Sequence, residues 1–154
     1  KDLGVGQEKA QDFIDAYFLR YPKVRNLCDA QIKKARKDGF VTTILGRRRY
    51  LPQINSANNT LRQFAERQAI NAPVQGSAAD LIKLAMINIQ RGLDRKKLQS
   101  RLTLQVHDEL VFDCPDAEVN QMQELVRQTM ENVLPLSVPV KVSITAGKNW
   151  LDAH

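Results

Sequence analysis

Two adjacent carboxylates, Asp108 and Glu109, follow a histidine in the middle of an alternating apolar and polar pattern. The pattern on either side of His107-Asp108-Glu109 is typical of two strands joined by a short turn. Tight hairpin turns favour glycine or asparagine where φ is positive, so an Asp-Glu turn departs from local turn chemistry. Paired carboxylates on a rigid hairpin could hold Mg²⁺ and, through the ion, phosphate oxygens. A solvated acidic turn is the ordinary alternative.

The composition is that of a soluble globular protein. The chain has 154 residues, of which 43% are hydrophobic and 26% charged, enough for one domain or for two lobes that share a thin core. No apolar run approaches the roughly 20 residues of a membrane span, and no signal peptide is visible. Cys28 and Cys114 have neither the spacing of a metal site nor the density of a disulfide framework, which favours a reducing compartment.

Positive charge is concentrated in the first half of the chain. Residues 1–70 hold 14 lysines and arginines against 7 acidic residues, a net charge of +7, whereas residues 71–154 hold 9 against 10, a net charge of −1. This asymmetry is compatible with a polyanion partner for the first half. Charge alone does not separate a nucleic-acid surface from an ordinary solvated lysine face.

Two amphipathic helices are expected at the start of the chain. Apolar residues from Ala10 to Tyr21 recur at helical spacing, Pro22 ends this helix and opens the next, and Gly39 is a typical C-terminal stop. The apolar residues of both helices are expected to face inward. No Ser, Thr, Asp or Asn stands directly before the first turn of this helix, and Lys1 to Leu3 read like the continuation of an earlier segment, so we expect a fragment.

An arginine-rich β-hairpin is expected next, from Phe40 to Leu51 around Leu45-Gly46. Side chains alternate along a strand, so at most two of the three arginines 47–49 share a face. Guanidinium groups suit phosphate oxygens, and Arg48 on the return strand is a candidate nucleic-acid contact. Simple solubility is the alternative.

Two helices separated at Pro73 are expected from about Thr60 to Gly92. Arg67, Asn71 and Gln75 are spaced four residues apart and would share one face if the kink at the proline is mild. Such donors could reach sugar, phosphate or minor-groove acceptors, whereas a polar seam facing solvent is the alternative.

The last third of the chain is expected to form a small antiparallel sheet with helices on one face. A hairpin spans residues 101–114, Asp116 is expected to cap a helix that continues to Val133, and residues 138–144 alternate as a final strand. Met122 is expected in the core. The fold class is therefore α+β.

Three stretches together resemble the family A DNA polymerases of bacteria. They are GRRRYLPQINSANNTLRQFAERQAINAPVQGSAAD from Gly46, QVHDELVFD from Gln105, and GKNWLDAH from Gly147. The resemblance covers essentially all of the chain, and the two longer motifs are far more specific than a single Asp-Glu pair.

The resemblance implies roles for individual residues. Asp108 would be a ligand of the catalytic Mg²⁺ ions, Glu109 would assist nearby, and His107 would lie close to the primer terminus. The family's AERxAxNxPxQG pattern places Arg67, Asn71 and Gln75 at positions that contact the template–primer duplex, largely from its minor-groove side. Residues 1–72 would be part of the fingers subdomain, and residues 73–154 would be part of the palm with the catalytic hairpin.

The chain also departs from the family pattern. A second aspartate in a DYSxxE-type motif and a nucleotide-binding helix with Arg, Lys and Tyr-Gly do not occur in the sequence. The resemblance therefore implies the C-terminal part of a DNA-directed DNA polymerase, with half of its two-metal Mg²⁺ site and no activity alone. The implied partners are primer–template DNA, deoxynucleoside triphosphates in the full-length enzyme and, through uncovered surface, a second copy of the chain; no membrane is implied. The implied location is the bacterial cytoplasm, with the nucleoid.

Two other function classes remain open. A duplex-binding module could keep the basic half and the polar helix face without the chemistry. A metal-dependent nuclease could use the same acidic turn, but hydrolases need further ligands, and His107 and His154 are the only histidines.

Overall fold

The computed structural model describes residues 6–153 and shows an α+β protein, as the sequence predicts. Lys1 to Leu3 and His154, which entered the sequence argument, lie outside the described residues. The chain divides into two compact units, Lys1–Val74 and Gln75–His154, which we describe one at a time.

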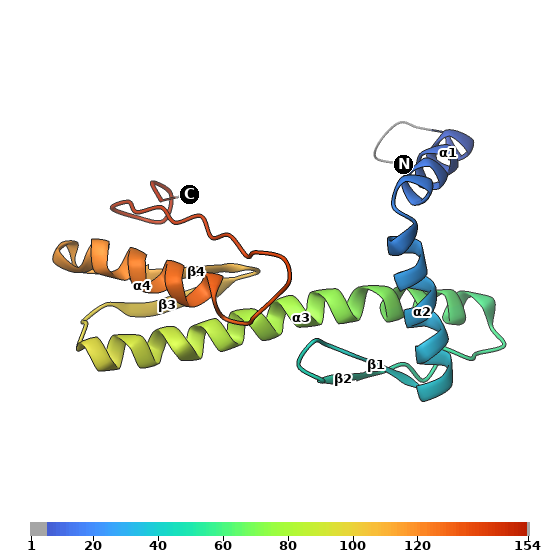
Figure 1. Cartoon of the computed structure of the whole chain (residues 1–154), viewed down its shortest axis with the longest axis horizontal. Coiled ribbons are helices and arrows are strands. Elements are labelled where there is room, and N and C mark those ends of the chain that lie inside the picture. Colours follow the sequence, from blue (N-terminus) through green and yellow to red (C-terminus); the bar gives the residue numbers. More distant parts are fainter. Residues whose placement is uncertain (1–5, 154) are drawn as a thin grey trace. The chain divides into compact units, whose positions relative to one another are not determined.

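The first unit contains two helices, a short hairpin and the start of a long helix (Figure 1). These elements are α1 (Gln7–Arg20), α2 (Pro22–Asp38), β1 (Phe40–Thr42), β2 (Arg48–Tyr50) and the first part of α3 (Asn59–Lys96). Pro22 is the first residue of α2, and Gly39 adopts φ 76° at its C-terminal cap. Both predicted helix ends are confirmed, because proline suits the first turn and glycine the left-handed cap.

The core of the first unit is small and excludes most of α1. It consists of six buried side chains from α2, β1, the loop before α3 and α3 itself: Ala35, Val41, Leu51, Ile54, Ala65 and Ala69. The prediction that the apolar residues of the first two helices face inward is largely wrong, because Phe13 is 63% exposed and Leu27 is 53% exposed. Helical spacing predicts which residues share a face but not what covers that face.

Helix α3 runs without interruption for 38 residues, with Pro73 inside it. The prediction of two helices separated at Pro73 is therefore wrong, as is the expected end at Gly92. Proline removes one hydrogen bond to the preceding turn, and the rest of this long helix tolerates the loss. The boundary between the two units falls just after the proline. Within the described residues, neither α3 nor any shorter helix combines the length and hydropathy of a membrane span.

The second unit packs the rest of α3 against a two-stranded sheet and a second helix. The further elements are β3 (Arg101–Val106), β4 (Glu109–Asp113), the 3₁₀ turn η1 (Asp116–Glu118) and α4 (Val119–Glu131). Ile89, Leu93, Met122 and Val126 form the buried core, so the predicted core position of Met122 is confirmed. Asp116 does not cap α4, because the 3₁₀ turn intervenes and moves the helix start to Val119.

Helices α3 and α4 approach closely at Gly92. A Cβ atom at this position would lie 2.7 Å from Cδ1 of Leu125, which is closer than real side-chain contacts. The glycine thus lets Leu125 approach the backbone of α3, and this packing explains why it lies inside the helix instead of ending it.

The final strand expected at residues 138–144 is not formed. The segment that follows α4 carries no strand, because no neighbouring strand within the described residues pairs with it (Figure 1, red).

Candidate nucleic-acid interface and metal-binding turn

A β-bulge sets the register of the β3–β4 hairpin. Leu102 lies opposite Phe112, but Leu104 lies opposite Val111, so Thr103 is an extra residue in β3. The Thr103 hydroxyl donates a 3.0 Å hydrogen bond to the carbonyl oxygen of Val111, which ties the extra residue to the partner strand. Because a bulge shifts the pairing by one residue, it decides which residues reach the turn.

Beyond the bulge the turn consists of His107 and Asp108. Val106 pairs with Glu109, which is the first residue of β4. The predicted Asp-Glu turn is therefore displaced by one residue, and the bulge is the physical reason. His107 adopts φ 52°, a positive value that costs energy in residues with a side chain. The sequence suggested an unfavourable backbone conformation in the turn. The structure shows one, but at His107 and not at the Asp-Glu pair.

The bulge also changes which side chains face the core. Leu110 and Phe112 pack against the core of the second unit, and Leu102 pairs with Phe112 on that side. Leu104 pairs with Val111 beyond the bulge and is 44% exposed. The expected single apolar face of β3 is thus divided between the two sides of the hairpin.

The side chains of the turn are open to solvent. His107, Asp108 and Glu109 are all exposed. The carbonyl oxygen of His107 accepts a 3.1 Å hydrogen bond from the side-chain amide of Gln105, which fastens the turn from one strand. Within the described residues the Asp108 carboxylate makes no hydrogen bond or ion pair, so its oxygens are accessible to a cation.

The donor set of the turn suits a partly hydrated magnesium ion better than a closed metal cage. No group of three or more histidine, cysteine, aspartate or glutamate side chains is placed to hold a metal within residues 6–153. Asp108 and Glu109 supply two neighbouring carboxylates. Mg²⁺ commonly binds through one or two carboxylates and completes its octahedron with water and phosphate oxygens. The carboxylates of the turn are of the donor type that such an ion requires.

The arginines of the β1–β2 hairpin point to different sides. The hairpin reverses over residues 43–47, where Gly46 adopts φ 81°. Arg48 lies over the ring of Phe40, with 4.7 Å from its Cζ atom to the ring centroid. Arg49 pairs with the buried Val41 and so points to the opposite side from Arg48. Arg48 thus lies on an exposed aromatic and basic face, beside the 67% exposed Tyr50.

The three polar residues of α3 are all exposed. Arg67 and Asn71 lie one helical turn apart in the first unit, and Gln75 is the first residue of the second unit. Arg67 approaches the ring of Phe64, at 5.9 Å from the centroid. Within the described residues the side chains of Asn71 and Gln75 have no hydrogen-bond partner, so their donors and acceptors remain available to a ligand.

Other cations of the first unit have structural partners. Arg36 forms an ion pair with Glu66 at 2.5 Å and thereby links α2 to α3. Arg62 donates to the carbonyl oxygen of Ser56 at 2.9 Å and to the Asn59 side chain at 2.8 Å. These arginines stabilise the loop before α3, whereas Arg67 makes no such bond.

Glu118, to which no sequence pattern pointed, organises the base of the β3–β4 hairpin. Its carboxylate accepts hydrogen bonds from the backbone N–H groups of Gln99 and Ser100, both at 2.9 Å, and from the Ser100 hydroxyl at 2.6 Å. The backbone bond from Gln99 is the largest cause of a pKa held below the usual value of 4.5 for this group, followed by the Ser100 hydroxyl. The only sequence signal was an acidic cluster after Pro115, and it pointed to Asp116 instead.

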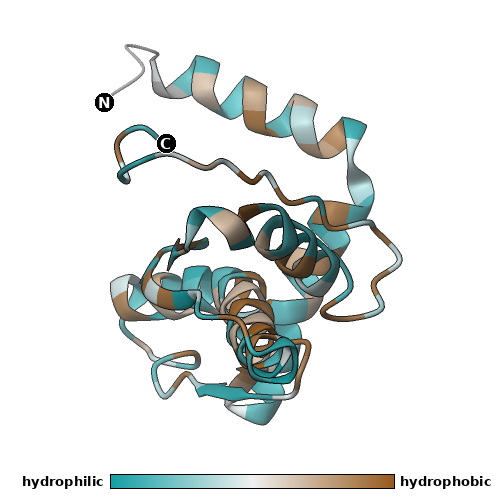
Figure 2. Cartoon of the chain, turned by 90° about the vertical axis from the view of Figure 1, so that its left-hand side faces the viewer, coloured by the Kyte–Doolittle hydropathy of each residue, from teal (hydrophilic) through white to brown (hydrophobic). Residues whose placement is uncertain are grey.

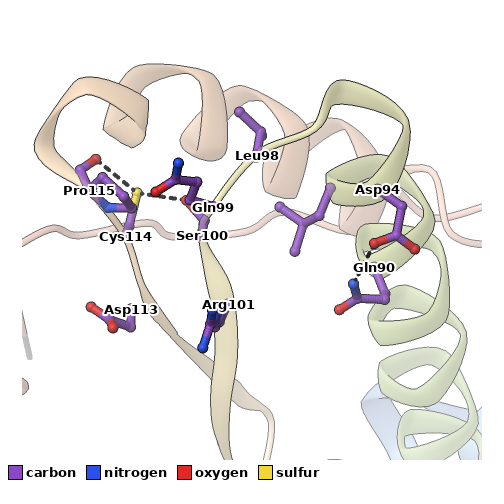
Figure 3. Close-up of a pocket in the computed structure, with 10 residues that line it drawn as sticks. Gln90, Asp94, Leu98, Gln99, Ser100, Arg101, Asp113, Cys114 and Pro115 are labelled. Atoms are coloured by element: carbon purple, nitrogen blue, oxygen red, sulfur yellow. Dashed lines mark hydrogen bonds between the residues drawn. The ribbon is translucent and has the colours of Figure 1, made fainter.

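A cavity of about 640 Å³ lies beside this base, between the end of α3 and the hairpin (Figure 3). Its lining includes Gln90 and Asp94, joined by a 2.9 Å hydrogen bond, together with Arg101, Asp113 and Cys114. Arg101 and Asp113 are the first pair of the hairpin, at the opposite end from the turn. The cavity is therefore remote from the carboxylates that could hold a metal.

The chain is similar to known polymerases along almost its whole length. The family described as DNA polymerase family A matches residues 1–152. DNA polymerase I of Mycobacterium tuberculosis is 47% identical over 150 residues, and that of Lactococcus lactis 45% over 153 residues. These matches cover 97% and 99% of the chain but only 17% of each relative.

A solved structure matches the fold equally well. The POL domain of Pol1 from Mycobacterium smegmatis, in complex with DNA primer-template and dNTP, has a TM-score of 0.95 and 46% sequence identity. The match covers 99% of this chain and 27% of that domain.

Proposed function

Since the chain belongs to DNA polymerase family A, we propose that it is the part of a DNA-directed DNA polymerase that holds the primer–template duplex and supplies one side of the catalytic metal site. The reaction would be template-directed, metal-dependent transfer of a nucleotide to a primer 3′-hydroxyl. The observation that carries the proposal is the exposed turn at His107 and Asp108, fixed by a bulge and followed at once by Glu109.

The catalytic hairpin would act through its three polar side chains. Asp108 would be the metal ligand of this chain, Glu109 would stand beside it, and His107 would lie near the primer terminus. Bound Mg²⁺ would lower the pKa of the primer hydroxyl and neutralise the charge of the departing pyrophosphate. The strained backbone at His107 supports a functional reading, because such strain clusters at active sites.

The exposed polar residues of α3 and the first hairpin would bind the duplex. Arg67, Asn71 and Gln75 carry the donors and acceptors that fit minor-groove atoms, and Arg48 would contact the phosphate backbone. Minor-groove acceptors are nearly the same for all base pairs, so these residues would hold a duplex without selecting its sequence. An enzyme that copies any template requires duplex binding that does not depend on sequence.

The isolated chain would not polymerise. Two-metal chemistry needs carboxylates on both sides of the ions, and the described residues supply one such side. We assign residues 1–72 to the fingers and residues 73–154 to the palm. In the bacterial cytoplasm the partners would be DNA and deoxynucleoside triphosphates, the latter through the assembled enzyme.

Binding of a fluorescent primer–template duplex across a salt series tests the duplex-holding role. The double variant Arg67→Ala, Gln75→Ala should bind more weakly. A plot of log affinity against log salt concentration should also be shallower by about 1, because the variant lacks one cationic side chain that displaces counterions from the DNA. Arg91→Ala, Gln121→Ala is the matched control, because it removes the same side-chain types from exposed positions of α3 and α4.

The affinities of the double variant and of the control decide whether the proposed surface holds the duplex. Loss of affinity in the first variant but not in the control supports the proposed surface. Equal affinities for both variants, or no salt-dependent binding by a folded chain, would exclude a duplex-holding role for this chain by itself.

A duplex-binding module without chemistry is the second candidate function. The exposed side chains of Arg67, Asn71 and Gln75 support it, because duplex binding through α3 does not require the carboxylates of the turn. Under this alternative Asp108→Ala leaves DNA affinity unchanged or raises it, because only a negative charge is removed. It also leaves unchanged any polymerisation by a mixture of the chain with the rest of the polymerase.

A further inference from the structure

The cavity beside the base of the β3–β4 hairpin has no part in the proposed function. Its volume of about 640 Å³ lies in the range of roughly 300–1,000 Å³ that is common for small-ligand pockets in proteins. The end of α3 and the start of β3 lie at the same end of the second unit (Figure 1), and Figure 2 looks onto this end. All lining residues belong to the second unit.

Two opposite charges line the cavity without pairing. Arg101 and Asp113 lie opposite each other at the first position of the β3–β4 register. Side chains at such positions are close enough to interact. Within residues 6–153, however, neither side chain makes a hydrogen bond or an ion pair, and Figure 3 accordingly draws no bond between them. An exposed ion pair contributes little to stability, so a ligand can bind both charges without breaking a valuable contact.

A third charge of the lining lies on α3. Oδ1 of Asp94 accepts a 2.9 Å hydrogen bond from the side-chain amide of Gln90, one helical turn earlier, and this bond orients the carboxylate. Within the described residues, Oδ2 of Asp94 has no partner. Leu93 and Leu98 supply apolar surface to the same cavity. A carboxylate together with apolar surface suits a cation at the end of an aliphatic chain.

Glu118 holds the segment between these charges in place. Its carboxylate accepts the backbone N–H groups of Gln99 and Ser100, and the Ser100 hydroxyl at 2.6 Å. Ser100 lines the cavity and is only 3% exposed. A site whose wall is fixed before binding loses less free energy when the ligand is ordered.

We propose that this cavity binds a free basic α-amino acid such as lysine. The α-carboxylate of the ligand binds the guanidinium of Arg101, and its α-ammonium binds the carboxylate of Asp113. The cation of the ligand side chain binds Asp94, and its methylene groups lie along Leu93 and Leu98. Arg101 contributes one positive charge and the two aspartates two negative charges, so the lining has a net charge of −1. A basic amino acid carries one net positive charge and balances it.

Other charged ligands fit the lining less well. The ammonium and carboxylate of an α-amino acid are attached to the same carbon atom, and Arg101 and Asp113 are likewise direct neighbours across the hairpin. A simple diamine would leave Arg101 without an anion and would bring positive charge close to it. A phosphate or a dicarboxylate would be repelled by Asp94 and Asp113.

The two cysteines allow binding to be located within the chain. Cys114 lines the cavity, whereas Cys28 belongs to α2 of the first unit, and both are half-buried free thiols. L-Lysine at about ten times its dissociation constant should slow alkylation of Cys114 by iodoacetamide by about tenfold, because only the unoccupied fraction reacts. The alkylation rate of Cys28, followed by mass spectrometry in the same sample, should not change.

Three analogues of lysine test the three charged contacts in the unmodified chain. Nα-acetyl-L-lysine lacks the α-ammonium and represents the C-terminal lysine of another protein. L-Lysinamide lacks the carboxylate, and L-norleucine lacks the cation of the side chain. Each should bind more weakly than L-lysine by about tenfold or more, because each loses one hydrogen-bonded ion pair.

Substitutions in the lining test the same contacts from the protein side. In calorimetric titrations, Asp94→Asn, Asp113→Asn and Arg101→Gln should each weaken L-lysine binding by about tenfold. Asp116→Asn and Arg95→Gln are the matched controls, because both residues are exposed nearby but do not line the cavity. Circular dichroism shows whether each variant is folded. Asp94→Asn should leave the weaker binding of norleucine unchanged, a result that general damage to the cavity would not give.

Every other result of the alkylation assay overturns the proposal. Equal protection by Nα-acetyl-L-lysine would assign the cavity to a C-terminal residue of another protein. Equal protection by L-norleucine would exclude the contact to Asp94. Absence of protection by L-lysine, or equal protection of Cys28 and Cys114, would exclude a binding site here. The assay contains neither DNA nor metal, so its result is independent of the proposed polymerase function.

Discussion

Thr103 and Val111 are joined across the β3–β4 hairpin by a 3.0 Å hydrogen bond from hydroxyl to carbonyl, at the place where the register shifts. Replacement of Thr103 by valine keeps the β-branched shape but removes this bond. We expect the free energy of unfolding in urea to fall by about 1 kcal/mol, the ordinary contribution of one hydrogen bond.

Thr60→Val is the control for that experiment, because the Thr60 side chain is exposed and makes no hydrogen bond within the described residues. It should change the free energy of unfolding much less. Equal losses in both variants would mean that the threonine hydroxyl does not stabilise the bulge.

Glu118 should make stability depend on pH. Its pKa lies below 4.5 in the folded chain, because the Gln99 N–H and the Ser100 hydroxyl stabilise the charged form. The folded state therefore binds protons less readily than the unfolded state, and the stabilisation is complete above the unfolded pKa of about 4.5 and is lost as pH falls through the folded pKa. Glu118→Gln should lower the thermal midpoint near neutral pH, with a difference from wild type that vanishes in acid.

Asp116→Asn tests whether this effect is specific. Asp116 precedes Glu118 in the same 3₁₀ turn, but its side chain does not cap the turn. This variant should follow the wild-type pH profile. A Glu118→Gln midpoint that differs from wild type equally at all pH values would contradict the proposed linkage.

Lys97 is a position where glycine should stabilise the protein. It adopts φ 55° directly after α3, and the N–H of Leu98 reaches the carbonyl oxygen of Leu93 at 3.1 Å, a bond typical of helix C-terminal caps. Lys97→Gly should raise the free energy of unfolding by about 1 kcal/mol, because the left-handed backbone no longer strains a side chain.

The opposite sign is expected inside the helix. Lys83→Gly, at an exposed position of α3, should lower the free energy of unfolding by about 1 kcal/mol through lost helix propensity. Chemical denaturation of the two variants therefore separates the backbone conformation at Lys97 from the effect of removing a lysine.

Asp108 should account for most of the metal affinity of the isolated chain. In a titration with Mn²⁺ followed by electron paramagnetic resonance, Asp108→Asn should reduce the affinity by about tenfold or more. Asp113→Asn removes an exposed carboxylate from the other end of the same hairpin and should have little effect. Equal binding by both variants would show that the turn does not hold the ion.

Local chemistry made several features predictable from the sequence. Pro22 and Gly39 mark the ends of α2, because each residue restricts or permits a particular backbone conformation. The hairpin around His107 follows from the alternation of apolar and polar residues from Leu102 to His107 and from the apolar run that begins at Leu110. The motifs that contain Asp108 and Arg67 were specific enough to predict the family.

Features that depend on distant contacts were not predictable. No pattern in residues 101–106 predicts the extra residue at Thr103. The predicted turn therefore lies one position away from the observed turn. Pro73 lies inside α3 because the helix on both sides packs into a core, which outweighs the local preference of proline. Residues 138–144 have the composition of a strand, but a strand forms only when another one pairs with it.

Unpaired backbone has a consequence for proteolysis. A protease binds its substrate as an extended chain, and residues 134–148 already have no backbone–backbone hydrogen bond to break within the described part of the protein. Lys141 is exposed in the middle of this stretch. Trypsin should therefore cleave after Lys141 before it reaches the many lysines and arginines of the helices.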